Sequence, residues 1–351
     1  MTISIPPARR GALMTLSAIL AFAALTPTQP ALAGDDDHVV ALMYHRFGEE
    51  EYPSTSVELA QFDAHLAEIA RAGHTVMTLG EVVDAWERGE DIPDNAIALT
   101  VDDGYSSVLR EGWPRMKAAG LRFTLFVSTD PSDRNVPGYL SWDEIRALAA
   151  EGVEIEAHSV LHPHLPDLGE EEIRAEIRNS ADRIEAETGR RPTLFAYPYG
   201  EANAAAIRIV QELGFKAAFG QHSGVMAPDL PRFYLPRFPV NEHYGEPALL
   251  AERMKGLVLP VTDVAPESPT VTPDQNPPHF GFTVTLPGQP LDRLACYRSD
   301  GGAIKGVEVM GRRVELRFDS AFDQGRTRVN CTLPTPDGRW RWFGWQFYRG
   351  Y

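Results

Sequence analysis

Cysteine is scarce in this sequence. Of its 351 residues only two are cysteines, Cys296 and Cys331, and both lie near the C-terminus. At most one intramolecular disulfide is therefore available. In an exported protein the pair could form that disulfide, and two free buried thiols are the alternative.

Long apolar runs are also missing, apart from one near the N-terminus. It extends from Leu13 to Leu25, follows two arginines and precedes small residues that end at Ala33. This layout is typical of a secretory signal peptide over residues 1–33, and the apolar stretch is short for a membrane span. We therefore predict an exported protein, periplasmic or secreted, with no membrane span in the mature chain. An uncleaved anchor is the alternative.

Positive charge is in short supply. Lys and Arg number 33 against 49 Asp and Glu, and the formal net charge is −16. Cleavage after Ala33 would remove Arg9 and Arg10 and no acid, which takes the net charge from −16 to −18. Such an acidic chain argues against a nucleic-acid partner and suits an exported protein.

Apolar patterning indicates a large first domain. From residue 39 to about 219, short apolar runs alternate with helical patterns, which is typical of a βα-repeating domain with a parallel sheet. The expected strands are 39–43, 96–101, 123–127, 153–157, 193–197 and 217–219. The expected apolar faces of two helices consist of Phe62, Leu66, Ile69 and Ala70, and of Ile173, Ile177, Ala181 and Ile184.

The C-terminal part has a different pattern. Residues 260–278 are rich in proline and polar residues, which predicts a stiff linker. Beyond it, alternating runs such as 307–309 and 314–318 predict a small β-rich domain at 279–351. The larger domain then covers residues 34–259. Aromatic residues near the C-terminus are expected in the core of the β domain, with a sugar-binding face as the alternative.

Two adjacent carboxylates, Asp102 and Asp103, follow the apolar run 96–101 and precede Gly104. Acidic residues beside glycine also occur in ordinary turns. Here they are expected at the carboxyl end of a buried strand, where they can place a metal ligand and a proton acceptor side by side.

The next chemical signal is a pair of histidines, His158 and His162, just past another expected strand. Two imidazoles four residues apart can bind the same ion. With Asp103 they would form a two-His, one-carboxylate site with open positions for water and substrate. His164 is a substitute ligand, although Pro163 is expected to turn it away. The pattern predicts a metal hydrolase.

Three motifs follow one another along the chain: Thr100–Gly104 (TVDDG), His158–His162 (HSVLH) and Tyr197–Gly200 (YPYG). In order and spacing they resemble the first three motifs of the polysaccharide deacetylase family, over about residues 38–240. The resemblance implies an α/β fold, a distorted NodB-like (β/α) barrel, here followed by the small all-β domain. It also implies removal of N-acetyl groups from amino-sugar polymers with a divalent metal, commonly zinc.

The resemblance implies a role for each matching residue. Asp103, His158 and His162 would bind the metal, Asp102 would be the general base, and the backbone N–H of Tyr199 would help form the oxyanion hole. Chemistry agrees with these roles, since a metal lowers the pKa of bound water from about 15.7 toward roughly 7 and a neighbouring carboxylate can take its proton.

An amide also needs a general acid, because its leaving nitrogen must be protonated. His45 directly follows the first expected strand, and the Tyr44-His45 pair resembles the exopolysaccharide branch of the family, in which this histidine is the acid. His222 is the rival. For either residue, an ordinary loop histidine is the alternative.

One position departs from the family pattern. Ala196 stands where many members have an arginine that orients the base. Arg237 could return a guanidinium to the site, and a surface or structural arginine is the alternative.

These observations favour an exported, metal-dependent N-deacetylase of a β-linked N-acetylglucosamine polysaccharide. An O-acetyl esterase acting on xylan-like polymers would use the same site, and a non-catalytic carbohydrate-binding protein is a further alternative. The linkage of the polymer, the native metal and the oligomeric state are not given by the sequence.

Overall fold

The computed structural model describes the chain except residues 3, 5–36 and 351. The predicted signal peptide therefore lies almost entirely outside the described residues. Among the residues that are described, no helix has the length and apolar character needed to cross a membrane. Contacts separate Met1–Ala31 from the compact unit Leu32–Tyr351, and everything below concerns the second unit.

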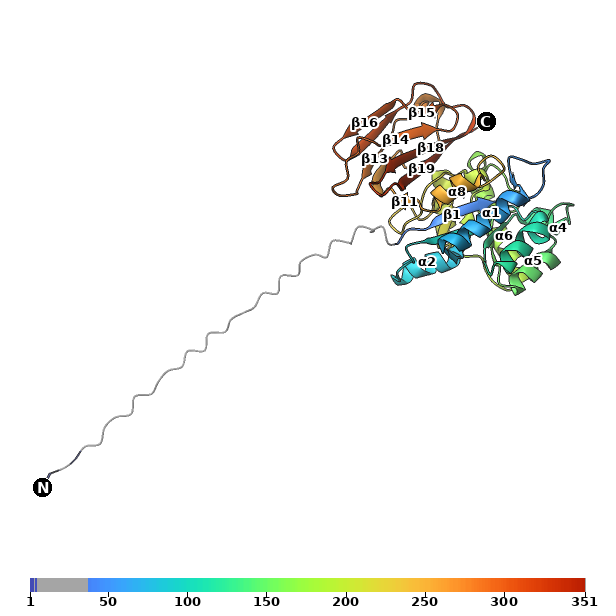
Figure 1. Ribbon diagram of the computed structural model, residues 1–351, viewed down its shortest axis with the longest axis horizontal. Helices are drawn as coiled ribbons and strands as arrows, with labels where there is room; N and C mark the ends of the chain where they lie inside the picture. Colours follow the sequence, from blue (N-terminus) through green and yellow to red (C-terminus); the bar gives the residue numbers. More distant parts are fainter. Residues whose placement is uncertain (3, 5–36, 351) are drawn as a thin grey trace. The chain divides into compact units, whose positions relative to one another are not determined.

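An eight-stranded parallel sheet forms the first part of this unit (Figure 1). Its strands, in spatial order, are β10 (Phe238–Pro239), β1 (Val40–Tyr44), β5 (Ala96–Val101), β6 (Thr124–Val127), β7 (Glu154–Ala157), β8 (Leu194–Ala196) and β9 (Ala217–Phe219), with β4 (Thr75–Met77) also paired to β5. This parallel, half-barrel sheet with its helices agrees with the predicted NodB-like, distorted (β/α) barrel. All six expected strands form, whereas β4 and β10 were not expected.

Helices follow most of the strands and pack apolar faces on the sheet. They are α1 (Leu59–Ala72), α2 (Leu79–Arg88), α3 (Trp113–Ala118), α4 (Thr129–Asp133), α5 (Trp142–Ala150), α6 (Glu170–Thr188), α7 (Ala204–Glu212) and α8 (Pro247–Arg253). Capping boxes begin α2 and α5, where Thr78 and Ser141 each accept a hydrogen bond from the backbone N–H of a glutamate three residues later.

One predicted helix face is confirmed and the other is partly wrong. All four expected core residues of α6 are fully buried. In α1, Ala70 is exposed and His65 is buried instead. His65 can be buried because both of its ring nitrogens have hydrogen-bond partners. These are the hydroxyl of Tyr44 at 3.1 Å and the carbonyl of Gly245 at 2.6 Å.

The C-terminal part contains two further sheets, drawn in the orange-to-red colours of Figure 1, as the predicted β-rich domain requires. One has the order β11 (Leu257–Val258), β19 (Trp340–Arg349), β18 (Gly325–Pro334), β14 (Ala295–Arg298) and β15 (Gly302–Ala303). The other has the order β12 (Val261–Ala265), β13 (Phe280–Val284), β17 (Arg313–Arg317) and β16 (Gly306–Met310). A small parallel pair, β2 (Arg46–Phe47) and β3 (Ser56–Val57), lies in the first part.

Two features of this region refine the sequence predictions. Cys296 and Cys331 are directly paired across β14 and β18 and form a disulfide. The expected linker 260–278 includes strand β12, which pairs with β13. Within β12 only Val261 is buried, so the segment lacks the apolar alternation that would have indicated a strand. The division of the chain into domains stays a prediction.

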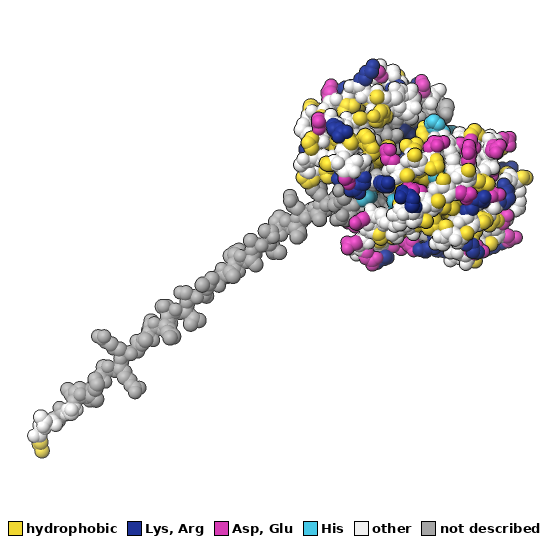
Figure 2. Space-filling model, in the orientation of Figure 1, with side chains coloured by type: hydrophobic (Ala, Val, Ile, Leu, Met, Phe, Trp, Pro, Cys, Tyr) yellow, Lys and Arg dark blue, Asp and Glu magenta, His cyan; other side chains and the backbone are white. Residues whose placement is uncertain are grey.

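Both acidic and basic side chains lie on the outer surface. Figure 2 shows acidic and basic side chains intermingled on the face that it presents. Many of them form ion pairs, such as Arg115 with Glu111 and Lys216 with Asp84. Exposed pairs of this kind contribute roughly 0–1 kcal/mol each, so the buried sheet and its helices carry most of the stability.

Candidate active site

Asp102 and Asp103 lie at the carboxyl end of β5, in the middle of the parallel sheet. Both side chains are buried. The backbone turns sharply here, because Asp103 has a φ of 74° and Gly104 a φ of 83°. A left-handed aspartate is uncommon, and such strain occurs preferentially at functional sites.

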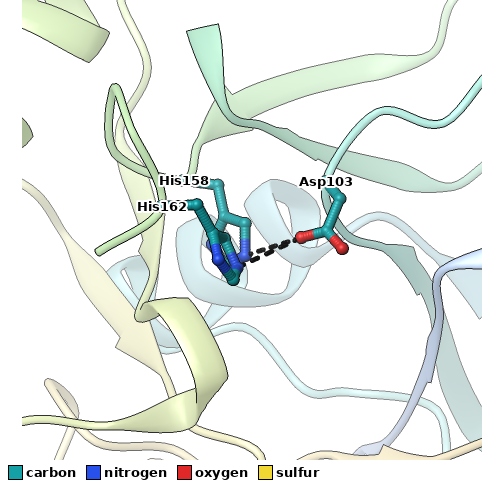
Figure 3. A group of neighbouring side chains, drawn as sticks. All are labelled: Asp103, His158 and His162. Carbon is teal, nitrogen blue, oxygen red and sulfur yellow. Dashed lines mark ion pairs between the residues drawn. The ribbon is translucent and has the colours of Figure 1, made fainter. Parts of the chain in front are cut away.

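Asp103, His158 and His162 come together into one cluster. Figure 3 shows both imidazole rings directed at one carboxylate oxygen of Asp103. The Nε2 atoms of His158 and His162 lie 3.2 and 3.3 Å from Asp103 Oδ1, and one ligand atom from each residue lies within 4.8 Å of the others. The structure therefore assembles the three residues that the motifs predicted as metal ligands.

The chemistry of these atoms fits a divalent metal. His158 Nδ1 donates a hydrogen bond to the carbonyl of Ala196 at 2.7 Å, which leaves Nε2 unprotonated in the neutral ring. That Nε2 and Asp103 Oδ1 are both buried, and neither has a hydrogen-bond partner among the residues that the structure describes. Two buried acceptors facing each other are costly unless a cation lies between them. Nitrogen and carboxylate donors in this combination suit zinc and related metals.

The loop that carries the two histidines is held from α6. Both Ser159 and His162 have left-handed backbones, with φ values of 65° and 57°. Ser159 Oγ accepts a hydrogen bond from the His162 N–H at 3.0 Å. Glu176 of α6 accepts the backbone N–H groups of residues 160 and 161, each at 2.9 Å. Sequence reasoning missed Glu176, because only the fold brings α6 to this loop.

Asp102 forms a bidentate ion pair with Arg237. The two guanidinium nitrogens donate to its two oxygens at 2.7 and 2.8 Å, and both side chains are completely buried. Arg237 also donates to the carbonyl of Gly220 at 3.1 Å and to Thr100 Oγ1 at 3.2 Å. Of the two alternatives for Arg237, these contacts favour a guanidinium that belongs to the site.

The electrostatic consequence for Asp102 is a stabilised anion. Burial alone raises the pKa of its carboxyl, but the Arg237 guanidinium and the nearby imidazoles outweigh burial, so the pKa lies below its usual value. Asp102 therefore stays ionised at neutral pH, as a proton acceptor must.

A cavity of about 670 Å³ opens over the cluster and separates the two candidate acids. His45 lines it together with Asp103 and His162, whereas His222 does not. His222 is buried against Tyr234, with ring centroids 4.7 Å apart. Burial, followed by the charges of two arginines, lowers the pKa of His222 to about 3. Burial also lowers the pKa of His45, against the opposing effect of the two site aspartates.

Tyr199 also lines the cavity, with a left-handed backbone at φ 58°. Its ring lies edge-on to His162 and stacks on His164, at centroid distances of 4.4 Å each. His164 Nδ1 pairs with Glu201 at 2.6 Å. Within the described residues the metal-competent cluster contains Asp103, His158 and His162, so the substitute ligand His164 supports Tyr199 instead.

The C-terminal sheet contributes to the same site, which the sequence did not indicate. The carbonyl of Tyr199 accepts hydrogen bonds from Arg326 at 3.0 Å and from Gln346 at 3.1 Å. Arg326, Arg328 and Ser299 line the cavity. The site is thus built by the parallel sheet and closed on one side by strands that follow more than a hundred residues later.

Comparison with known proteins agrees with this geometry. Residues 89–218 match the family model described as polysaccharide deacetylase. The predicted resemblance to this family is confirmed over the matched residues.

Particular relatives extend the match. The poly-β-1,6-N-acetyl-D-glucosamine N-deacetylase of Escherichia coli (strain K12) is 22% identical over 255 residues, which cover 59% of this chain and 38% of that protein. The Streptococcus pyogenes deacetylase PplD, solved in complex with acetate, matches 62% of this chain and 98% of its own, with 21% identity and a TM-score of 0.58. IcaB from Ammonifex degensii matches 62% of this chain and 97% of its own, with 24% identity and a TM-score of 0.56. The two solved structures share the fold.

Proposed function

We propose that this protein is an exported, metal-dependent hydrolase that removes N-acetyl groups from a β-linked N-acetylglucosamine polysaccharide. One observation carries the proposal: a buried Asp-His-His cluster lies beside an ionised aspartate and opens on a cavity of about 670 Å³. The name of the E. coli relative supports the substrate, and the acetate bound to PplD supports the product. The N-terminal segment, which has the layout of a signal peptide, supports export.

Asp103, His158 and His162 would hold the metal, for which Zn²⁺ is the best candidate. When bound, the metal would polarise the acetyl carbonyl and lower the pKa of water in the site. The hydrogen bond from His158 to Ala196 fixes the ring so that Nε2 is free to bind.

Asp102 acts as the general base. It accepts the proton of the attacking water, while Arg237 holds both carboxylate oxygens and keeps the group ionised. Arg237 thereby takes the role of the arginine that orients the base in the family pattern, at whose position this chain has Ala196. The guanidinium comes from a different part of the chain and reaches the same base.

Tyr199 and His45 complete the chemistry. The backbone N–H of Tyr199 stabilises the negative charge that develops on the carbonyl oxygen, and a well-placed donor of this kind contributes about 3 to 4 kcal/mol. His45, which lines the cavity, protonates the leaving nitrogen. His222 is buried against Tyr234 and does not line the cavity, which favours His45 as the acid.

Acetate release from β-linked N-acetylglucosamine oligosaccharides tests the proposal, with the metal content of the protein measured in parallel. We expect acetate from the zinc-loaded protein and none after metal removal. Asp102→Asn should bind zinc normally and release little acetate. A zinc-loaded protein that releases no acetate from any oligosaccharide would contradict the proposal and favour a binding protein.

A further inference from the structure

Two arginines of strand β18, Arg326 and Arg328, form part of the wall of the active-site cavity. They are separated by one residue, and alternate residues of a strand lie on the same face of a sheet. The disulfide between Cys331 and Cys296 ties β18 to its neighbour β14. The two guanidinium groups are thus presented to the cavity by a covalently braced pair of strands.

Among the described residues no carboxylate forms an ion pair with Arg326 or Arg328; the buried carboxyl of Glu201, on which the charge of Arg326 acts, is paired with His164. In the described part of the chain the Arg328 side chain has no hydrogen-bond or ion-pair partner, and its Nε is buried and unsatisfied. Arg326 donates to two neutral groups, the carbonyl of Tyr199 and the side-chain oxygen of Gln221, at 3.0 and 3.2 Å. The wall therefore carries two positive charges, in a protein with an excess of acids.

Their mutual effect is repulsive. Burial and the charge of Arg326 together lower the pKa of Arg328 to about 10, so Arg328 remains charged at neutral pH. Arg237, the buried guanidinium of the same site, is already paired with Asp102. Keeping two like charges together without a counter-ion costs free energy that an anionic ligand would recover.

We propose that Arg326 and Arg328 form a subsite for an anionic substituent, a carboxylate or phosphate on a sugar next to the N-acetylated sugar that is cleaved. Guanidinium groups match both kinds of oxyanion through paired N–H donors. The cationic wall disfavours a neighbouring sugar that bears an ammonium group. The proposal rests on the proposed function for the reaction, but the binding of the anion does not depend on it.

Arg328→Gln is the decisive variant, because Arg326 and Gln346 donate the hydrogen bonds to the Tyr199 carbonyl and both stay in place when the charge of Arg328 is removed. Three sets of β-linked N-acetylglucosamine oligosaccharides of equal length serve as substrates: neutral, uronate-containing and phosphate-bearing. We expect wild-type kcat/KM to favour at least one anionic set by about tenfold or more, and Arg328→Gln to remove that preference. Arg317→Gln, on β17 and away from the cavity, is the matched control and should keep it.

Direct binding separates the failure of this proposal from the failure of the proposed function. Titration calorimetry with His45→Ala, which leaves the Asp102–Arg237 pair intact, measures the affinity for the same three sets while turnover is slowed. We expect tighter binding of an anionic set, weakening as salt is added, and loss of both effects when Arg328→Gln is combined with His45→Ala. Equal affinity for neutral and anionic sets, or a preference that survives Arg328→Gln, would overturn the subsite even if acetate is released. Anion-dependent binding without acetate release from any set would retain the subsite and reject the proposed reaction.

Discussion

We call the buried pair of Asp102 and Arg237, which is not among the residues lining the cavity, the floor of the site, and Arg326 and Arg328 its wall. The floor and the wall handle charge in opposite ways. On the floor, Arg237 is bound through both terminal nitrogens to Asp102 and both groups are completely buried. On the wall, Arg328 is half-buried and has no partner within the described chain. The charge of the floor arginine is therefore balanced before any substrate binds, whereas the charge of the wall arginine is not. The first arrangement serves chemistry that must be prearranged, and the second serves recognition.

The largest expected effect comes from breaking the floor pair. Arg237→Met leaves a buried carboxylate without its partner, which costs about 3 to 5 kcal/mol of stability. Arg328→Gln should cost little or be neutral, because it removes one of two like charges. Chemical denaturation of both variants measures the difference. Equal losses would mean that the two arginines do not differ in the way their contacts indicate.

Replacing His45 tests whether this cavity-lining histidine is the general acid. His45→Ala should lower N-deacetylation about 10²- to 10⁴-fold, because the amide nitrogen must leave protonated. Hydrolysis of an activated acetyl ester, whose leaving group needs no proton, should be much less affected. His279→Ala, at an exposed position of the C-terminal part, is the control. Parallel losses on amide and ester would argue against the acid role.

His222 reports on both regions, because the charges of Arg237 and Arg328 act on it. Its pKa is about 3 in the folded protein and about 6.5 when unfolded. Between these values the unfolded state binds more protons, so stability falls as the pH is lowered from about 6.5 toward 3. The loss between pH 6.5 and 4.5 is about 2 kcal/mol.

His222→Gln removes the titrating group and should flatten this acid dependence. Denaturation midpoints measured at several pH values for wild type and variant provide the test. An unchanged slope in the variant would assign the acid sensitivity to other groups.

The smallest expected effect concerns the hydrogen bond between the wall and Tyr199. Gln346→Met removes the donor to the Tyr199 carbonyl and should lower kcat about tenfold, because a positioning residue acts through another group. KM and zinc content should stay unchanged. Gln211→Met, at an exposed position of α7, is the control. A lower melting temperature with normal kcat would show that Gln346 is merely structural.

The sequence predicted the parts of the site that are local in the chain. The strand 96–101, the paired aspartates and the two histidines four residues apart were available from short patterns, since a strand places its last residues at one edge of the sheet. The chain pattern also gave His45 as the first choice of acid, and its role stays a prediction.

Contacts between residues that lie far apart in the chain could not be predicted from the sequence. Arg237 was left between two interpretations, because nothing near it in the chain indicates that it meets Asp102, 135 residues earlier. Glu176, Gln346 and Arg328 carried no local signal at all. Strand β12 was missed because only one of its residues is buried. In each case tertiary packing supplies what periodicity does not contain.

The contacts of the C-terminal sheets with the rest of the protein limit how far the chain can be truncated. A fragment that stops at residue 259 keeps β11 but loses β19, its pairing strand, and so exposes an open sheet edge that invites aggregation. The same fragment frees the Tyr199 carbonyl from both of its donors. Recombinant work is therefore better based on the chain through its last strand than on the deacetylase motifs alone.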